Sequence, residues 1–338
     1  MYLYKLIFTT TLFVSTFMAV SSYTWLGAWM GLEINLLSFI PLMKDKNNSY
    51  ASESSMKYFL IQAFASSLFF MSIILIMFMN NLISELILIK QTLMIILNSS
   101  ILLKMGAAPF HFWFPEIIDG LNWINSLILM TWQKIAPMML LSYSIKTSSF
   151  ISFIIISCSL IGSIMGLNQT SIRKLLAYSS INHMGWMICS FMKNEMIWII
   201  YFMIYSIISM TLISMLNSYK IFFLKQFYNS MNMNILIKFS IMINLLSLGG
   251  LPPFLGFLPK WMVIQFLSLN FKFILMIMIM STLITLFFYL RIAYSSLLIN
   301  HNQLNFYQIN IHSMSPINFL LTFISISGLI FCTWMMNM

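Results

Sequence analysis

Residues 106–116 read GAAPFHFWFPE and residues 250–260 read GLPPFLGFLPK. Glycine, proline, phenylalanine and proline recur at four of these eleven positions, with a constant offset of 144 residues from Gly106 to Gly250. Proline removes a backbone donor and clashes with the preceding helical turn, and glycine weakens a helix. The pair therefore predicts two broken helices at matching places of an internal repeat.

The sequence around these two stretches is too apolar for a water-soluble protein. Of 338 residues, 60% are hydrophobic and only 7% are charged, and the mean hydropathy is +0.92. A soluble chain needs about a quarter of its residues charged to cover its surface. A helix needs about 20 apolar residues to cross a bilayer, so the sequence predicts about eleven spans, at 3–21, 25–43, 56–79, 86–106, 122–145, 149–167, 172–191, 196–217, 236–257, 272–298 and 316–336.

The spans group into two sets of five plus one. The expected fold is an all-α polytopic membrane protein with a first five-helix repeat in residues 1–145, a second in residues 149–298 and a C-terminal helix at 316–336. Each break interrupts the fourth helix of its set, and because five is odd the two repeats are inverted. Broken helices at matching positions of inverted repeats indicate an ion path. The polar seventh span, 172–191, must be shielded by its neighbours.

The formal charge of +10 does not indicate nucleic-acid binding, because the cations are scattered singly between apolar segments. They are interpreted as topology signals. Four lie on the side of the odd-numbered loops: Lys90, Lys146, Lys193 and Lys272. Ten lie on the other side and favour an N-terminus on that more positive side: Lys5, Lys44, Lys46, Lys57, Arg173, Lys174, Lys220, Lys225, Lys238 and Arg291.

Redox centres and structural metals are not expected in this chain. Its three cysteines, Cys158, Cys189 and Cys332, are far apart and form no C-x-x-C motif. The first apolar stretch lacks a persuasive cleavage site, so we expect the N-terminus to be retained. The excess of residues with AT-rich codons, including 32 Met and 31 Phe, fits an AT-rich organelle genome that reads an extra codon as Met.

Four ionisable residues remain at membrane depth: Glu33, Lys104, Lys134 and Lys260. A charge at the bilayer centre costs roughly 2.5–3.5 kcal/mol on insertion scales, so such residues usually mark an ion or proton path. Burial disfavours the ammonium form of a lysine, which lets a buried lysine release as well as accept a proton. The alternative is that each one reaches the interface from a helix end or forms a structural ion pair. Pro137 is expected to kink the helix beside Lys134.

Two histidines, His111 and His183, are further candidates because imidazole can relay protons between lysines. The competing interpretation, a hydrogen-bonded packing residue, stays open for both. His301 and His312 flank a polar loop and are expected to be solvated. Glu116 follows the first break and is expected on a solvated or interfacial face.

At these motifs the chain resembles the antiporter-like subunits of respiratory complex I, which are similar to multi-subunit cation/proton antiporters. Within that family the second break most resembles that of subunit 2, and the AT-biased composition is insect-like. The resemblance extends across most of the chain and rests on the stretches at 103–115 (LKMGAAPFHFWFP), 132–137 (WQKIAP), 174–186 (KLLAYSSINHMGW) and 249–261 (GGLPPFLGFLPKW).

The resemblance implies a core subunit that couples electron transfer from NADH to ubiquinone to proton pumping from the mitochondrial matrix to the intermembrane space. It implies that Glu33, Lys104, Lys134 and Lys260 belong to the central hydrophilic axis. The N-terminus is then expected on the matrix side of the inner membrane and the C-terminus in the intermembrane space.

The resemblance also implies partners and cofactors. The expected partners are other membrane-arm subunits, including neighbouring antiporter-like ones, and the lipid bilayer. FMN, the iron-sulfur clusters and ubiquinone are expected in other subunits, with no cofactor in this chain and bound phospholipid as an option. A stand-alone cation/proton antiporter and a structural spacer of the membrane arm remain as alternatives.

Overall fold

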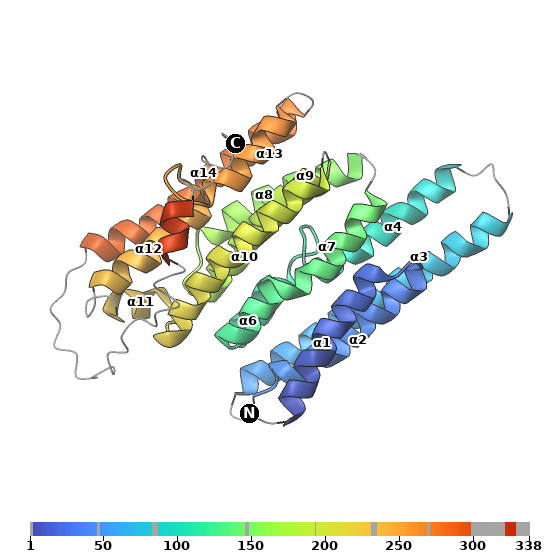
Figure 1. Ribbon diagram of the computed structural model, residues 1–338, viewed down its shortest axis with the longest axis horizontal. Helices are drawn as coiled ribbons and strands as arrows, with labels where there is room; N and C mark the ends of the chain where they lie inside the picture. Colours follow the sequence, from blue (N-terminus) through green and yellow to red (C-terminus); the bar gives the residue numbers. More distant parts are fainter. Residues whose placement is uncertain are drawn as a thin grey trace. The chain divides into compact units, whose positions relative to one another are not determined.

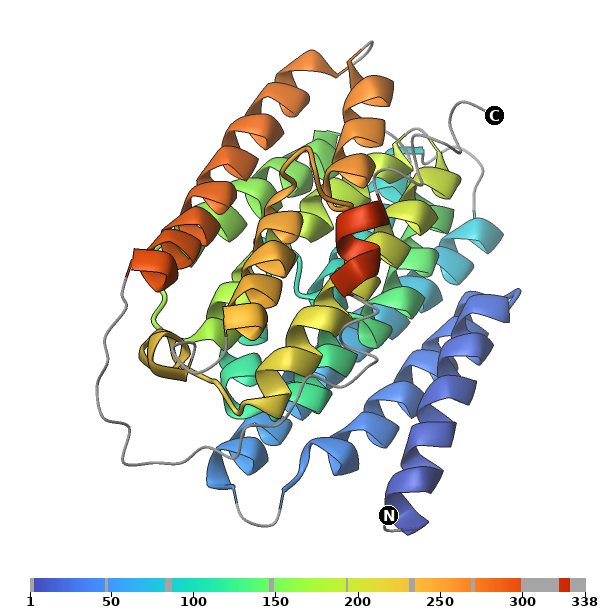
Figure 2. The ribbon, with the colours of Figure 1, turned by 60° about the vertical axis from the view of Figure 1, so that its left-hand side comes forward.

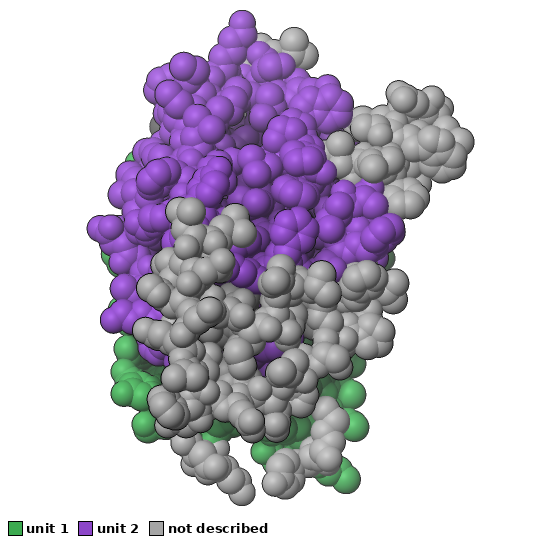
Figure 3. All heavy atoms as spheres, turned by 90° about the vertical axis from the view of Figure 1, so that its left-hand side faces the viewer, with its two compact units in different colours: residues 1–154 green, residues 155–338 purple. Residues whose placement is uncertain are grey.

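The computed structural model describes residues 3–45, 48–82, 87–145, 149–192, 194–230, 235–268, 271–298 and 322–328. Within these ranges the regular elements are all α-helices (Figure 1). The chain divides into two compact units, Met1–Ile154 and Ile155–Met338, which Figure 3 colours separately.

Unit 1 contains the first break and the helices that pack around it. Helix α1 packs against α2 and α7, α2 packs against α3, α3 packs against α4 and α5, and α4 packs against α7. Figure 1 shows α1, α2 and α3 side by side. The helices are α1 (Leu3–Ser21), α2 (Trp25–Met43), α3 (Ser49–Leu82), α4 (Ile87–Met105), α5 (Trp113–Gly120), α6 (Trp123–Met130) and α7 (Trp132–Ser144), and α8 (Ser149–Gly166) begins in this unit.

Unit 2 surrounds one polar helix. Helix α9 packs against α10, α13 and α14, and every residue from Leu175 to Phe191 is buried. The shielding expected for this polar span is therefore present in the structure. The remaining helices are α9 (Ile172–Phe191), α10 (Glu195–Ser218), α11 (Leu224–Ser230), α12 (Ile235–Gly249), α13 (Phe257–Leu267) and α14 (Lys272–Leu298).

Six helices within the described ranges are long and apolar enough to cross a membrane. They correspond to α1, α2, α3, α8, α10 and α14. Of the last expected span, 316–336, only residues 322–328 lie within the described ranges, and these are helical. His301, His312 and Cys332 lie outside the described residues.

Both predicted breaks are present, at the same offset as the sequence repeat. Helix α4 ends at Met105 and α12 at Gly249, while α5 begins at Trp113 and α13 at Phe257, so ends and starts each lie 144 residues apart. Figure 2 shows the irregular backbone between α12 and α13. Gly106 has φ +73° and Gly250 has φ +84°, a conformation that favours glycine because it has no Cβ. The helical segments after the breaks, α5 and α13, are absent from the eleven predicted spans.

The predicted span at 122–145 consists of two helices, because the helix is interrupted at Thr131 between α6 and α7. The Leu127 carbonyl accepts from both the Thr131 hydroxyl at 2.7 Å and the Thr131 N–H at 3.0 Å. The Lys134 N–H bonds to the Thr131 carbonyl, only three residues back, at 3.2 Å. Pro137 lies inside α7, so the interruption precedes the kink expected at that proline.

Helix α3 begins at Ser49, before the predicted start of the third span at residue 56. The Asn48 side chain accepts a hydrogen bond from the Tyr50 N–H at 3.1 Å, and Lys57 pairs with Glu53 one turn before it at 3.1 Å. Capping and an i,i+4 pair stabilise helical turns that carry too little apolar surface to be counted as a membrane span.

The two adjacent glycines at the second break offer a matched test of its backbone geometry. We expect Gly250→Ala to destabilise the protein by about 1–2 kcal/mol, because a Cβ at this left-handed residue is strained and would lie 3.0 Å from the Lys260 side chain. The measurement is the thermal denaturation midpoint of the protein in detergent.

Gly249→Ala is the control. A Cβ there would have its nearest neighbour at 3.6 Å, an ordinary contact. Equal midpoints for the two variants would contradict the importance of the positive φ.

Candidate functional site

Lys104 lies in the last turn of α4, just before the first break. Its side chain is only 7% exposed, and its Nζ lies 5.8 Å from the centroid of the Phe69 ring. The Gln62 side chain donates to the Lys104 carbonyl at 3.1 Å, and this satisfies one carbonyl that the helix end leaves unpaired. The structure therefore buries the Lys104 ammonium beside an aromatic face, at the end of a broken helix.

Glu33 lies on α2 and is half-buried. Its Oε2 atom is buried and has no hydrogen-bond partner among the described residues. No Glu33 ion pair within 4.0 Å occurs in the described parts of the chain. The sequence left open whether Glu33 interacts with Lys104 or Lys134, and no ion pair of Glu33 selects one of the two lysines.

Lys134 lies in the first turn of α7 and is 1% exposed, which makes it one of the largest fully buried side chains. Its Nζ lies 5.1 Å from the centroid of the Phe114 ring. Phe114 belongs to α5, and its Cβ would lie 3.0 Å from a Cβ added at Gly106. The first break and Lys134 are therefore connected through one aromatic side chain.

Two amides next to these charged residues join α2 to α7. The side-chain amide of Asn35 donates to the side-chain oxygen of Gln133 at 2.8 Å. The side-chain amide of Gln133 donates back to the side-chain oxygen of Asn35 at 3.2 Å. We call this reciprocal pair the amide clasp. Neither residue was predicted from the sequence, although each lies within two residues of a predicted one, Glu33 or Lys134.

Lys260 lies in the first turn of α13, after the second break, and is 6% exposed. Its Nζ donates to the carbonyl oxygens of Gly249 at 2.9 Å and Leu248 at 3.3 Å, the last residues of α12. A cation at a helix C-terminus stabilises unpaired carbonyls and opposes the helix dipole. Lys260 therefore stabilises the second break by donating to carbonyl groups at the end of α12.

The two candidate histidines are both buried. His111 lies in the loop of the first break, with Nδ1 at 3.2 Å from the Pro109 carbonyl oxygen. His183 lies on α9, with Nδ1 at 2.8 Å from the Tyr201 hydroxyl of α10. Each is thus a hydrogen-bonded residue of the interior, an arrangement compatible with both interpretations given to it from the sequence.

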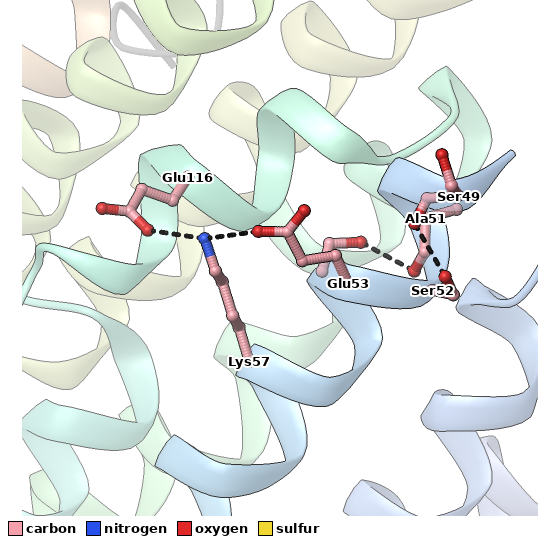
Figure 4. Close-up of polar contacts among 7 residues, drawn as sticks. Ser49, Ala51, Ser52, Glu53, Lys57 and Glu116 are labelled. Carbon is pink, nitrogen blue, oxygen red and sulfur yellow. Dashed lines mark hydrogen bonds and ion pairs between the residues drawn. The ribbon is translucent and has the colours of Figure 1, made fainter.

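Figure 4 shows a contrasting charged group at the protein surface, where Lys57 lies between Glu53 and Glu116. Lys57 Nζ is 3.1 Å from Glu53 and 3.2 Å from Glu116. All three side chains are exposed, as expected for Glu116. Exposed pairs of this kind contribute about 0–1 kcal/mol, so they join α3 to α5 only weakly.

Lys238 lies in the first turn of α12, which begins at Ile235, and is buried. The predicted span at 236–257 contains it, and it was counted among the ten cations of the more positive side.

The chemistry that these groups permit is proton transfer. Within the described ranges, no group of three His, Cys, Asp or Glu residues could hold a metal ion. Lysine, histidine and carboxylate groups each bind or release a proton, and burial brings the charged and neutral forms of lysine and carboxylate closer in free energy. Unit 1 contains Glu33, Lys104 and Lys134, and unit 2 contains His183 and Lys260.

Comparisons with known proteins agree with this membrane fold. Residues 22–286 match the family described as NADH:quinone oxidoreductase/Mrp antiporter, TM. NADH-ubiquinone oxidoreductase chain 2 of Anopheles gambiae is 55% identical over 328 residues, covering 96% of this chain and 95% of the relative.

Two solved structures show the same fold at low sequence identity. A chain of respiratory complex I from Thermus thermophilus has a TM-score of 0.78 and 20% identity, covering 87% of this chain and 71% of that one. A chain of the Mrp complex from Dietzia sp. DQ12-45-1b has a TM-score of 0.72 and 14% identity, covering 84% of this chain and 59% of that one.

The amide clasp can be tested by removing one partner. We expect Gln133→Leu to destabilise the protein by about 1–3 kcal/mol, because the buried Asn35 amide loses both hydrogen bonds. The measurement is the denaturation midpoint in detergent.

Gln265→Leu on α13 makes the same chemical change at an exposed position and should have little effect. Adding Asn35→Leu to Gln133→Leu should recover part of the loss, because no unpaired amide then remains. A double variant less stable than the single one would argue against the clasp.

Proposed function

Because this chain belongs to the NADH-ubiquinone oxidoreductase chain 2 family, we propose that its buried lysines and Glu33 are the groups through which it moves protons. The family membership confirms the resemblance inferred from the motifs. The chain is a proton-translocating subunit of the membrane arm of respiratory complex I, and thus part of an H⁺-translocating NADH:ubiquinone reductase. It is a multi-pass protein of the mitochondrial inner membrane.

The observation that carries the proposed path is the burial of Lys134, which is 1% exposed. Lys104 and Lys260 are also buried. A structural spacer has no need of three lysines placed where charge is costly. Their burial supports a role in which each lysine alternates between its neutral and charged forms.

In the proposed mechanism, the Glu33 carboxylate favours the protonated form of a buried lysine of its own unit, Lys104 or Lys134. Weakening that interaction, or the approach of another cation, favours proton release. Moving one proton against 100 mV costs about 2.3 kcal/mol. That energy corresponds to a change of about two units in the pKa of one group, within the range that burial and a neighbouring charge produce.

We further propose the complete layout: about eleven spans, with inverted repeats at 1–145 and 149–298 and a C-terminal helix at 316–336. The common offset of the two breaks supports this layout. So does a second parallel, since Asn35 donates to Gln133 on α7 and Asn182 donates to Thr285 on α14 at 3.4 Å. The ten-to-four distribution of cations supports an N-terminus in the matrix and a C-terminus in the intermembrane space.

The partners and cofactors follow from complex I membership. The chain contacts other membrane-arm subunits, and the redox cofactors are carried elsewhere in the complex. We propose that neighbouring antiporter-like subunits are among those partners, that the cofactors are FMN, iron-sulfur clusters and ubiquinone, and that phospholipid binds at the lipid-facing surface.

Two other functions lead to different expectations. A stand-alone cation/proton antiporter, suggested by the shared fold with an Mrp chain, would exchange ions when purified alone. A structural spacer would tolerate loss of its buried lysines. Identity of 55% along almost the full length of a complex I chain favours the proposed function over the first alternative.

Lys134→Met separates the proposed function from the spacer. We expect the intact complex to assemble but to lose about tenfold or more of its coupled turnover, because Met fills the space without binding a proton. The measurement is NADH oxidation and proton pumping by the purified complex in sealed vesicles, per assembled complex.

Lys272→Met is the matched control, because Lys272 is exposed at the start of α14, and it should retain full pumping. Unchanged pumping with Lys134→Met would overturn the proposed role of Lys134 and favour the structural spacer.

A further inference from the structure

The best-defined polar contact of unit 2 that the proposed path does not use is the one between His183 and Tyr201. The Tyr201 hydroxyl lies 2.8 Å from Nδ1 of His183, and Tyr201 is only 1% exposed. The two residues come from the adjacent helices α9 and α10. This bond is therefore shielded from water and fixed by the packing of two helices.

The surroundings hold the imidazole ring in one orientation. The ring centroid of His183 lies 6.0 Å from that of Tyr201 and 5.2 Å from that of Tyr205. Helix α13, which carries Lys260, packs against both α9 and α10. His183 therefore lies on α9, one of the two helices that pack against α13.

A neutral imidazole has one N–H donor and one acceptor nitrogen, and the bond at one nitrogen decides the role of the other. If the Tyr201 oxygen accepts from Nδ1–H, that bond persists in both the neutral and the protonated ring. A hydroxyl that donated to Nδ1 would have to turn whenever that nitrogen became protonated. The accepting arrangement needs no rearrangement in a closely packed interior.

We propose that Tyr201 is a positioning residue that fixes the tautomer of His183, so that Nε2 is the nitrogen that exchanges protons. The Nε2 lone pair takes a proton and forms imidazolium, the Nδ1–H stays on the Tyr201 oxygen, and release of the Nε2 proton restores the neutral ring. This inference rests on the proposed function, because it extends to His183 a proton path that consists so far of the buried lysines and Glu33. It adds to that path a tyrosine with no role in the lysine chemistry itself.

The test is Tyr201→Phe in the intact complex, reconstituted into sealed vesicles. We expect normal assembly and about a fivefold fall in coupled turnover, the loss equivalent to one buried hydrogen bond. The pH profile should also shift by about half a unit or more, because the histidine loses a partner. The titratable and charged groups on the helices that pack against α9 are Glu195, Tyr201 and Tyr205 of α10, Lys260 of α13, and Lys272, Tyr289, Arg291 and Tyr294 of α14. Cys158 of α8 lies beside Gly185 of α9.

A double-mutant cycle separates positioning from a general loss of stability. In a His183→Gln background, Tyr201→Phe should cause no further loss of turnover, because the hydroxyl acts through the imidazole. Tyr58→Phe is the matched control, since Tyr58 is a buried tyrosine of α3 that packs on the rings of Phe39 and Trp113, and its turnover and pH profile should match wild type.

Two outcomes would overturn the inference: wild-type turnover and pH profile with Tyr201→Phe, or equal losses from Tyr201→Phe with and without His183. These outcomes are distinguishable from failure of the proposed function. Loss of pumping with Lys134→Met together with an unaffected Tyr201→Phe complex would reject the positioning role alone.

Discussion

The structure depends on one constraint, that backbone polar groups inside a bilayer must find partners within the protein. Two helices end in irregular backbone, and the chain supplies the missing partners. At the first break, the Trp113 indole donates to the Leu103 carbonyl at 3.2 Å, while Gln62 donates to the Lys104 carbonyl. At the second, Lys260 donates to the end of α12, and the Leu255 N–H donates to the Ser325 carbonyl at 3.2 Å. The breaks are therefore stabilised by contacts from other segments of their own unit.

The same constraint gives the three buried lysines different surroundings. Lys104 faces the ring of Phe69 at the end of α4, Lys134 faces the ring of Phe114 in the first turn of α7, and Lys260 donates to backbone carbonyls. Each environment therefore stabilises the charged form of its lysine to a different degree.

The sequence predicted most helices and both breaks because hydropathy and Gly-Pro patterns act locally. It also identified Lys134 as a buried charge, because a lysine far from both ends of an apolar span cannot reach the membrane interface. It missed α5, α11 and α13, which are too short for the length criterion of a membrane span. It missed the interruption at Thr131, where the Lys134 N–H bonds to the carbonyl only three residues back.

The sequence by itself determined that the chain is an all-helical membrane protein with two related breaks and a few charges inside apolar helices. Those properties follow from the cost of exposing polar groups to lipid, which depends on residue type and order along the chain. Only the tertiary structure decided the partners, such as Asn35 with Gln133 across 98 residues and His183 with Tyr201 on the next helix. Which side chains meet depends on how helices rotate and pack against each other, and a one-dimensional pattern leaves that rotation free.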